Sequence, residues 1–247
     1  MSQQSGTVAS DPAFTVNLPE PEDRRAAMFP PPVYRRAWTH RDLLSIFPPK
    51  GIRVLDIGAG WAPLQLREQD ELVTTDFESE ADAEVTTDVT SDWPFGEREF
   101  DLINMSHVLE HFYPNDRDAV IRNVYNSLKP GGLVFIRVPH RSSFHSRGWE
   151  HHTSYGLGEL TSLCHGHNPM LPMFRCVSVG ASTSLDFYGE RSAPRRLLER
   201  GLSRYWRLTD KLLANVVGGI PEVQFMLQRM GEETEQRLRR DSNAYIY

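Results

Sequence analysis

An aspartate and two glycines at the end of a predicted strand have the types and spacing to hold a nucleotide-like cofactor. They occur in VLDIGAG, residues 54–60. The apolar residues of this segment are typical of a strand that is buried on both faces. Gly58 and Gly60 would let the chain turn sharply, with its backbone close to a ligand. Asp56 would add a negative charge beside that turn.

The residues around the turn favour one cofactor class over another. A dinucleotide fingerprint, GxGxxG, would need a third glycine three residues after Gly60, but the chain has Pro63 there. The carboxylate of Asp56 also suits a positively charged ligand better than a diphosphate. S-adenosylmethionine carries both an ammonium and a sulfonium group. We therefore favour this cofactor, and an NAD oxidoreductase is disfavoured.

Two more acids end the next predicted strands. Asp76 ends ELVTTD, about 20 residues after the first strand, which is the spacing at which a carboxylate can bind ribose hydroxyls. Asp88 ends AEVTTD and could accept a hydrogen bond from an adenine amine. Only seven residues separate Thr75 from Ala83, fewer than the dozen or so that a helical crossover needs. We therefore expect the second helix to be missing and the third strand to be rudimentary or replaced by a loop.

Taken in order, the motifs resemble those of class I S-adenosylmethionine-dependent methyltransferases, in their small-molecule, type 11/23-like branch. The similar segments are VLDIGAG, VTTDF, DVTSDWPF, FDLINMSHVLEHF and LKPGGLVFIRVP, within residues 53–163. The resemblance implies a Rossmann-like, seven-stranded, mostly parallel α/β sheet with helices on both faces and an antiparallel seventh strand. It also implies S-adenosyl-L-methionine as cofactor and the following binding residues: Asp56, Gly58, Gly60, Asp76, Phe77, Asp88, Val89 and Ser106.

The elements around these motifs suggest a core with appendages. We expect a flexible tail at 1–32, a methyltransferase core at 33–182, a helical insertion at 183–221, a final core strand at 222–232 and a tail at 233–247. Residues 33–47 have helical spacing, and Tyr34 and Trp38 are either packing residues or part of a lid. A helix is also expected at 159–164. The pattern of the insertion predicts a basic amphipathic helix or helix pair at 192–217. That helix would pack on the domain, form a homodimer contact, cover an acidic substrate or contact a membrane surface.

Histidines supply the candidate base. Methyl transfer requires in-line alignment and exclusion of water, and a hydroxyl acceptor must also lose a proton. Histidine titrates near neutrality, and His151 resembles the family's histidine before the helix that follows the fifth strand, so we predict His151 as catalytic, with His140 and His145 as alternatives.

Two other groups resemble metal sites. His107, Glu110 and His111 form H-x-x-E-H, the inverted zinc-protease signature, but the motif follows a parallel strand and no third ligand is identified. The cysteines and histidines at 151–176 match no tetrahedral spacing. We therefore assign no metal.

Composition narrows the function classes. The chain has 247 residues, 39% hydrophobic residues and a net charge of -6, which argues against general nucleic-acid binding. No run approaches the roughly 18 apolar residues of a membrane span, so no stable membrane insertion is expected. Two cysteines form no disulfide framework, and we expect a cytoplasmic location. The acceptor is expected to be a small molecule, with a hydroxyl of a sugar or secondary metabolite preferred. The alternative is a non-catalytic regulatory or assembly subunit with the same fold.

Overall fold

The computed structural model describes residues 34–36, 40–61, 63–141, 143, 148–156, 174–182 and 222–229. The predicted tails, the helix at 159–164 and the insertion at 183–221 lie outside these residues. So do His145, Trp38 and the cysteine and histidines at 164–167.

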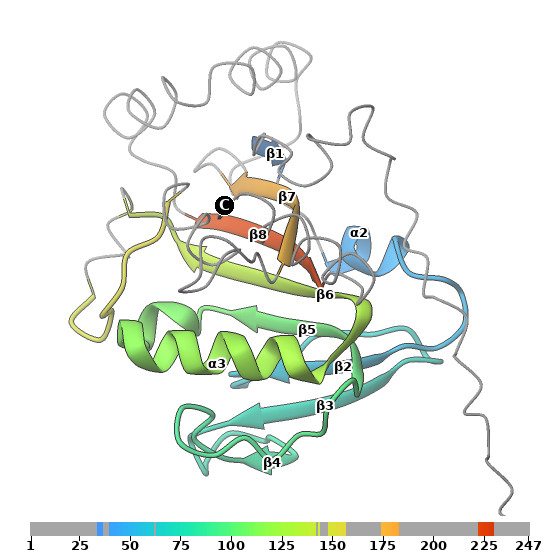
Figure 1. Cartoon of the computed structure of the whole chain (residues 1–247), viewed down its shortest axis with the longest axis horizontal. Coiled ribbons are helices and arrows are strands. Elements are labelled where there is room, and N and C mark those ends of the chain that lie inside the picture. Colours follow the sequence, from blue (N-terminus) through green and yellow to red (C-terminus); the bar gives the residue numbers. More distant parts are fainter. Residues whose placement is uncertain are drawn as a thin grey trace, which may run out of the picture.

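The core is a mixed eight-stranded sheet in the order β1-β7-β8-β6-β5-β2-β3-β4 (Figure 1). Every neighbouring pair is parallel except those of β8, which is antiparallel to both β6 and β7. The seven predicted strands are all present, and the Rossmann-like fold with an antiparallel final strand is confirmed. The strands are β1 (Tyr34–Arg36), β2 (Arg53–Ile57), β3 (Glu71–Asp76), β4 (Val85–Thr86), β5 (Phe100–Ser106), β6 (Leu128–Pro139), β7 (Phe174–Ser182) and β8 (Glu222–Arg229).

The prediction of one helix over residues 33–47 is wrong for its first part. Residues Tyr34–Arg36 form the additional strand β1, and helix α2 is confined to His40–Ser45. β1 pairs in parallel with β7, whose outer backbone groups would otherwise be left unpaired at the edge of the sheet. This tertiary pairing outweighs the helical spacing of the side chains.

Helices cover both faces of the sheet, as predicted. Successive strand residues point to opposite faces, so each strand contributes to two cores. On one face α2 packs with apolar residues that include Val54, Leu102 and Phe135. On the other face helix α3 (Pro114–Ser127) packs with residues that include Ile103 and Ile136, and Figure 1 shows α3 lying along the sheet.

The connections at the β4 end of the sheet are short. Residues 77–84 link β3 to β4 without a helix, and β4 has only two residues, so the expected loss of the second helix and the rudimentary third strand are confirmed. The described residues of the β2–β3 connection contain no helix either. The carboxyl ends of these strands therefore carry bare loops. Among the helices that the structure describes, none is long and apolar enough to cross a membrane.

Candidate cofactor site

The turn after β2 has the backbone conformation that its glycines predict. Gly58 and Gly60 have φ values of 67° and 51°, in the left-handed region that favours glycine. A Cβ atom on Gly58 would lie 2.4 Å from Cγ2 of Val108, so this position also lacks room for a side chain. The N–H groups of Gly58 and Ala59 both donate to the carbonyl oxygen of Thr75, which holds the turn against the end of β3.

Asp56 lies beneath this turn and is only 3% exposed. Its Oδ2 accepts a hydrogen bond of 2.7 Å from the N–H of Leu64, and its Oδ1 accepts one of 2.6 Å from Nδ2 of Asn104. The carboxylate therefore joins the loop after β2 to the neighbouring strand β5. Asp56 does not line the pocket described below.

Asp76 connects the ends of β2 and β3. Its Oδ2 accepts a hydrogen bond of 2.8 Å from the N–H of Gly60, and its Oδ1 accepts one of 3.0 Å from the N–H of Glu78. The side chain is buried, yet it lines the pocket. The predicted ribose acid thus also organises the glycine turn.

A pocket of about 310 Å³ opens at the carboxyl ends of the parallel strands, within the size range of small-molecule sites. Five of the predicted cofactor residues line it, namely Gly58, Asp76, Phe77, Asp88 and Val89. Gly60 reaches the site through its hydrogen bond to Asp76, and Ser106, at the end of β5, is not among the lining residues. The structure therefore brings together the residues that follow three different strands.

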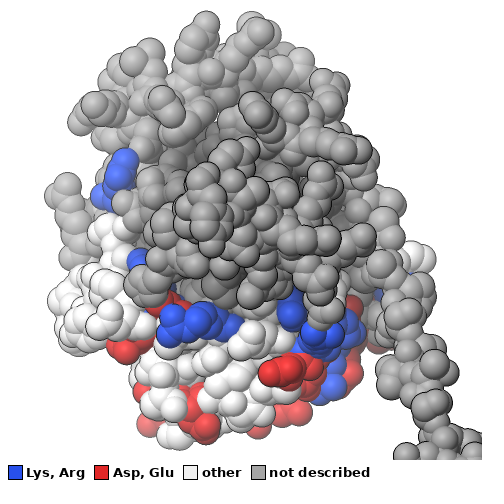
Figure 2. Space-filling view, viewed as in Figure 1, with Lys and Arg blue, Asp and Glu red and all other residues white. Residues whose placement is uncertain are grey.

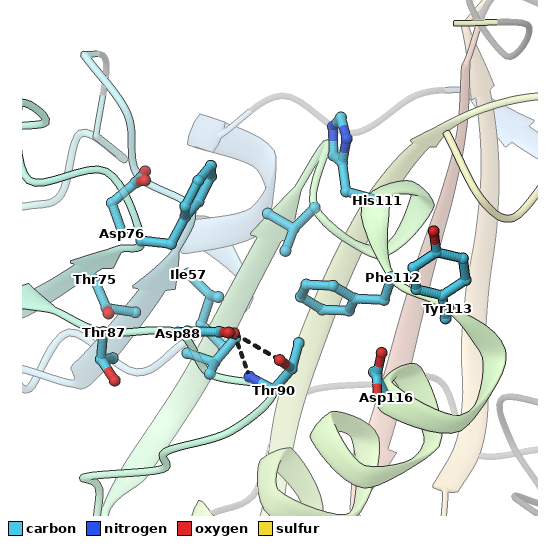
Figure 3. A pocket seen from close by; sticks show the side chains of 14 residues that line it. Ile57, Thr75, Asp76, Thr87, Asp88, Thr90, His111, Phe112, Tyr113 and Asp116 are labelled. Carbon is cyan, nitrogen blue, oxygen red and sulfur yellow. Dashed lines mark hydrogen bonds between the residues drawn. The ribbon is translucent and has the colours of Figure 1, made fainter. Parts of the chain in front are cut away.

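Asp88 is held in the ionised state within this pocket. Its Oδ1 accepts hydrogen bonds from the hydroxyl and the N–H of Thr90, at 2.7 and 2.9 Å (Figure 3). These two bonds hold the pKa of Asp88 below its usual value. The segment 76–92 contains seven acids and no Lys or Arg. Figure 2 shows Asp and Glu side chains gathered along the lower border, where β3 and β4 lie in Figure 1. The surroundings of the pocket therefore favour a cationic ligand.

The opposite side of the pocket comes from the segment after β5. It consists of Val108, His111, Phe112, Tyr113 and Asp116, and Figure 3 shows His111, Phe112 and Tyr113 across the pocket from Asp76 and Asp88. Sequence reasoning identified SHVLEHF as a family segment but did not assign its last residues to the pocket. The two aromatic residues Phe112 and Tyr113 so soon after a strand end were the available signal. In the structure Tyr113 is exposed and Phe112 is partly buried.

The H-x-x-E-H segment does not form the regular helix that a zinc-protease chelate requires. His107 has a φ of 58°, and only Leu109–His111 form a single 3-10 turn, η1. His107 and His111 therefore have different partners. Nδ1 of His107 lies 3.3 Å from Oε1 of Glu110, and its Nε2 lies 3.2 Å from Oε2 of Glu222. These carboxylates raise the pKa of His107 to about 9, despite the opposing effect of burial.

Glu222 begins β8 and is the centre of this ion network. Burial opposes its ionisation, but hydrogen bonds from His107 and Arg137 outweigh that effect and lower the pKa of Glu222 to about 2. Arg137 Nη2 lies 2.9 Å from Oε2 of Glu222. The network ties the end of β5 to β6 and β8, and it holds the first residues of the pocket segment in place.

The candidate base His151 does not line the pocket itself but contacts His111, which does. Its ring contacts that of His111 edge to face, with a centroid distance of 4.9 Å, and His111 lines the pocket. The loop that carries His151 is anchored because the N–H groups of His152 and Thr153 donate to the carbonyl oxygen of Glu110. The alternative base His140 is buried at the end of β6.

Comparisons with known proteins agree with this geometry. The model of a family described as a methyltransferase domain matches residues 33–175. An uncharacterized methyltransferase of Synechocystis is 40% identical over 55 residues, an alignment that covers 22% of this chain and 26% of that protein. This chain therefore matches only about a quarter of the length of that relative.

Two solved structures are similar in fold. One is a SAM-dependent methyltransferase from Archaeoglobus fulgidus, with a TM-score of 0.53, 17% identity and coverage of 76% of this chain and 90% of that one. The other is a SAM-dependent methyltransferase from Methanosarcina mazei, with a TM-score of 0.51, 14% identity and coverage of 80% and 100%. At these identities the similarity concerns the fold.

Proposed function

This chain belongs to the methyltransferase domain family, and on that premise we propose that it transfers a methyl group from S-adenosylmethionine to a hydroxyl of a small-molecule acceptor. The observation that carries the proposal is the pocket at the carboxyl ends of β2, β3 and β4. It unites the glycine turn with the carboxylates of Asp76 and Asp88.

The residues of the pocket fit the parts of the cofactor. Asp76 and Asp88 offer carboxylate acceptors for ribose hydroxyls and the adenine amine, respectively. The absence of a side chain at Gly58 allows close approach of a ligand to the backbone. The bound cofactor supplies a methyl group that its sulfonium already activates. The chain's own contribution is to bind, align and exclude water. The excess of acids in residues 76–92 favours the cationic donor over its neutral product.

The loops around the pocket carry exposed aromatic rings. In the described part of the chain, the large exposed apolar side chains are Trp61, Phe77, Tyr113 and Trp149. They lie on the loops after β2, β3, β5 and β6, which all leave the sheet at the same edge as the pocket. Exposed aromatic groups gathered at one edge are typical of a binding surface. Flat apolar rings suit the face of a sugar or of another cyclic metabolite.

A proton acceptor is available close to these aromatic side chains. Nδ1 of His151 is buried and has no hydrogen-bond partner among the described residues. The contact of His151 with His111 brings it to the wall of the pocket. We assign the removal of the acceptor proton to this histidine pair, with His151 as the base.

Calorimetric titration of the full chain with S-adenosylmethionine and S-adenosylhomocysteine tests the cofactor assignment. We expect micromolar binding, and Asp76→Asn should weaken it by about tenfold or more, since charged hydrogen bonds contribute about 1.5–3 kcal/mol. Asp82→Asn is the matched control, because Asp82 is an exposed acid of the same loop that does not line the pocket. If the unmodified chain binds neither compound, the proposal fails and a non-catalytic assembly or regulatory subunit is favoured.

The acceptor requires a separate experiment. Metabolite extracts incubated with the enzyme and methyl-labelled donor should yield products heavier by one labelled methyl group in place of hydrogen. His151→Ala should lower the initial rate of product formation while cofactor affinity is unchanged. An unaltered rate in this variant would remove His151 from the mechanism.

A further inference from the structure

Three side chains beside the pocket have the chemistry of an open metal site. Ligand atoms of Glu110, His111 and His151 all lie within 4.8 Å of one another. A tetrahedral site with bonds of about 2.1 Å separates its ligand atoms by about 3.4 Å, so small side-chain rotations would bring the three to bonding distance. The three groups come from η1 and from the loop at 148–153, which are about 40 residues apart in the chain.

The carboxylate of Glu110 gives an independent sign of a ligand here, because its cationic partner, His107, contacts only one of its two oxygens. Its residue is only 2% exposed, and neither carboxylate oxygen makes a hydrogen bond among the described residues. Oε1 forms an ion pair with His107 at 3.3 Å, whereas Oε2 has no hydrogen-bond partner among the described residues. A buried carboxylate without hydrogen bonds is costly unless it coordinates a metal or pairs with a cation.

The two histidines are arranged as metal ligands commonly are. Nδ1 of His111 lies 3.3 Å from the carbonyl oxygen of Glu150, in position to donate a proton to it, which leaves Nε2 as the coordinating atom. Nδ1 of His151 is buried and has no hydrogen-bond partner among the described residues. The backbone bonds from His152 and Thr153 to Glu110 hold the two ligand-bearing segments together.

From these observations we propose that Glu110, His111 and His151 bind one divalent transition-metal ion at the wall of the pocket. Imidazole ligands select transition metals over magnesium or calcium, and two histidines with one carboxylate leave coordination positions open. This site differs from the H-x-x-E-H chelate considered from the sequence, because His107 is replaced by the distant His151. It also departs from the sequence-based expectation of no metal.

The ion also has a role in catalysis, and this step rests on the proposed function. An acceptor hydroxyl bound to the ion would lose its proton more readily, since a bound metal lowers the pKa of a water ligand to about 7. The proton passes to solvent, the acceptor oxygen forms a bond to the methyl carbon, and the carbon–sulfur bond breaks to release S-adenosylhomocysteine. With the ion bound, His151 would be one of its ligands, and the proton removal assigned above to His151 would instead be promoted by the ion.

The site is tested by titrating chelator-treated full-length protein with Co²⁺, whose visible absorption reports nitrogen and oxygen ligation, and with Zn²⁺ in competition. We expect one ion per chain. Glu110→Gln and His151→Ala should each weaken Co²⁺ binding by at least about tenfold. His152→Ala is the matched control, because His152 neighbours the site but stacks on Tyr113 at 4.0 Å and is not in the cluster.

Binding of S-adenosylhomocysteine, measured on the same metal-free samples, separates the outcomes. If Glu110→Gln still binds S-adenosylhomocysteine, the variant is folded. If Glu110→Gln proves to be unfolded, His111→Ala replaces it as the variant that removes a ligand. Absence of stoichiometric Co²⁺ binding, or equal affinity in all variants, overturns the metal site even if S-adenosylhomocysteine binds. Co²⁺ binding with the expected losses supports the site even if S-adenosylhomocysteine fails to bind, an outcome that refutes the proposed function alone.

Discussion

Replacing Asp56 should destabilise the fold more than it weakens any direct contact with the cofactor. The buried carboxylate accepts hydrogen bonds from the N–H of Leu64 at 2.7 Å and from Nδ2 of Asn104 at 2.6 Å. Asp56→Ala removes both acceptors and leaves two buried donors without partners. At about 1–3 kcal/mol for each unsatisfied donor, the free energy of unfolding should fall by about 2–6 kcal/mol.

Asp56→Asn should cost less, because the amide has nearly the same shape. Its carbonyl oxygen can still accept from Leu64. Oδ1 of Asn104 has no hydrogen-bond partner in the described part of the chain, and the NH₂ group of the new asparagine can donate to it once the Asn104 amide turns over. Only the charge assistance of two hydrogen bonds is lost, which amounts to about 1–2 kcal/mol in total.

Urea unfolding monitored by circular dichroism at neutral pH measures these differences by linear extrapolation. Asp82→Ala, at an exposed position, is the control. An Asp56→Ala variant as stable as the control would refute this reasoning. The sequence-based role, a charge that attracts the ammonium and sulfonium groups, makes a different prediction. It requires Asp56→Asn to weaken binding of the cationic donor far more than that of S-adenosylhomocysteine, with stability almost unchanged.

Three further changes test other contacts. Gly58→Ala should lower the melting temperature and weaken cofactor binding, because the new Cβ would lie 2.4 Å from Cγ2 of Val108, at a residue with a φ of 67°. If the clash with Val108 dominates, adding Val108→Ala should restore part of the lost stability. If the second substitution restores nothing, backbone strain at residue 58 is the cause. The pKa of Glu222 falls from 4.5 in the unfolded chain to about 2 in the folded one, so its contribution to stability is complete above about pH 4.5 and is lost as the pH falls toward 2. Urea unfolding should show a lower free energy of unfolding at pH 3 than at pH 5, and this difference should be smaller in Glu222→Gln. An equal difference in both proteins would contradict a lowered pKa of Glu222. Tyr155→Phe should reduce the free energy of unfolding by about 1 kcal/mol, because it loses the 3.1 Å hydrogen bond to the carbonyl oxygen of Leu109. Tyr155→Ala should reduce it by about 3–5 kcal/mol, because the buried ring is also lost. Similar losses for both variants in urea unfolding would show that the hydroxyl contributes most of the stability.

Much of the sheet and of the cofactor edge could be predicted because the signals are local. Buried strands read as apolar runs, and a glycine that needs a positive φ occurs at the turn itself. Asp76 ends β3 and Asp88 follows β4 by two residues. Because parallel strands bring their carboxyl ends to one edge, order along the chain was enough to place both acids at one pocket. The short interval before residue 83 likewise ruled out a crossover helix on length alone.

Other features depend on partners far away in the chain. β1 is a strand because β7 offers an edge about 145 residues later, and no pattern within residues 33–47 contains that information. The left-handed conformation of His107 is accompanied by its contact with Glu222, 115 residues away. The same holds for Asp56, whose acidic side chain could be read from the sequence but whose partners, Leu64 and Asn104, became known only from packing.

The histidines show the division most clearly. The sequence predicted a base at His151 through its resemblance to the family's histidine, and it showed an H-x-x-E-H pattern at 107–111 to which no metal was assigned. Side chains a few positions apart are the only neighbours that a sequence reveals. Tertiary structure instead places Glu110 and His111 beside His151, after the chain has crossed β6 and returned along the 148–153 loop. Local backbone preference determines most of the strands and turns, β1 excepted, whereas the grouping of polar side chains at a site is decided by long-range packing and by the need to compensate buried charge.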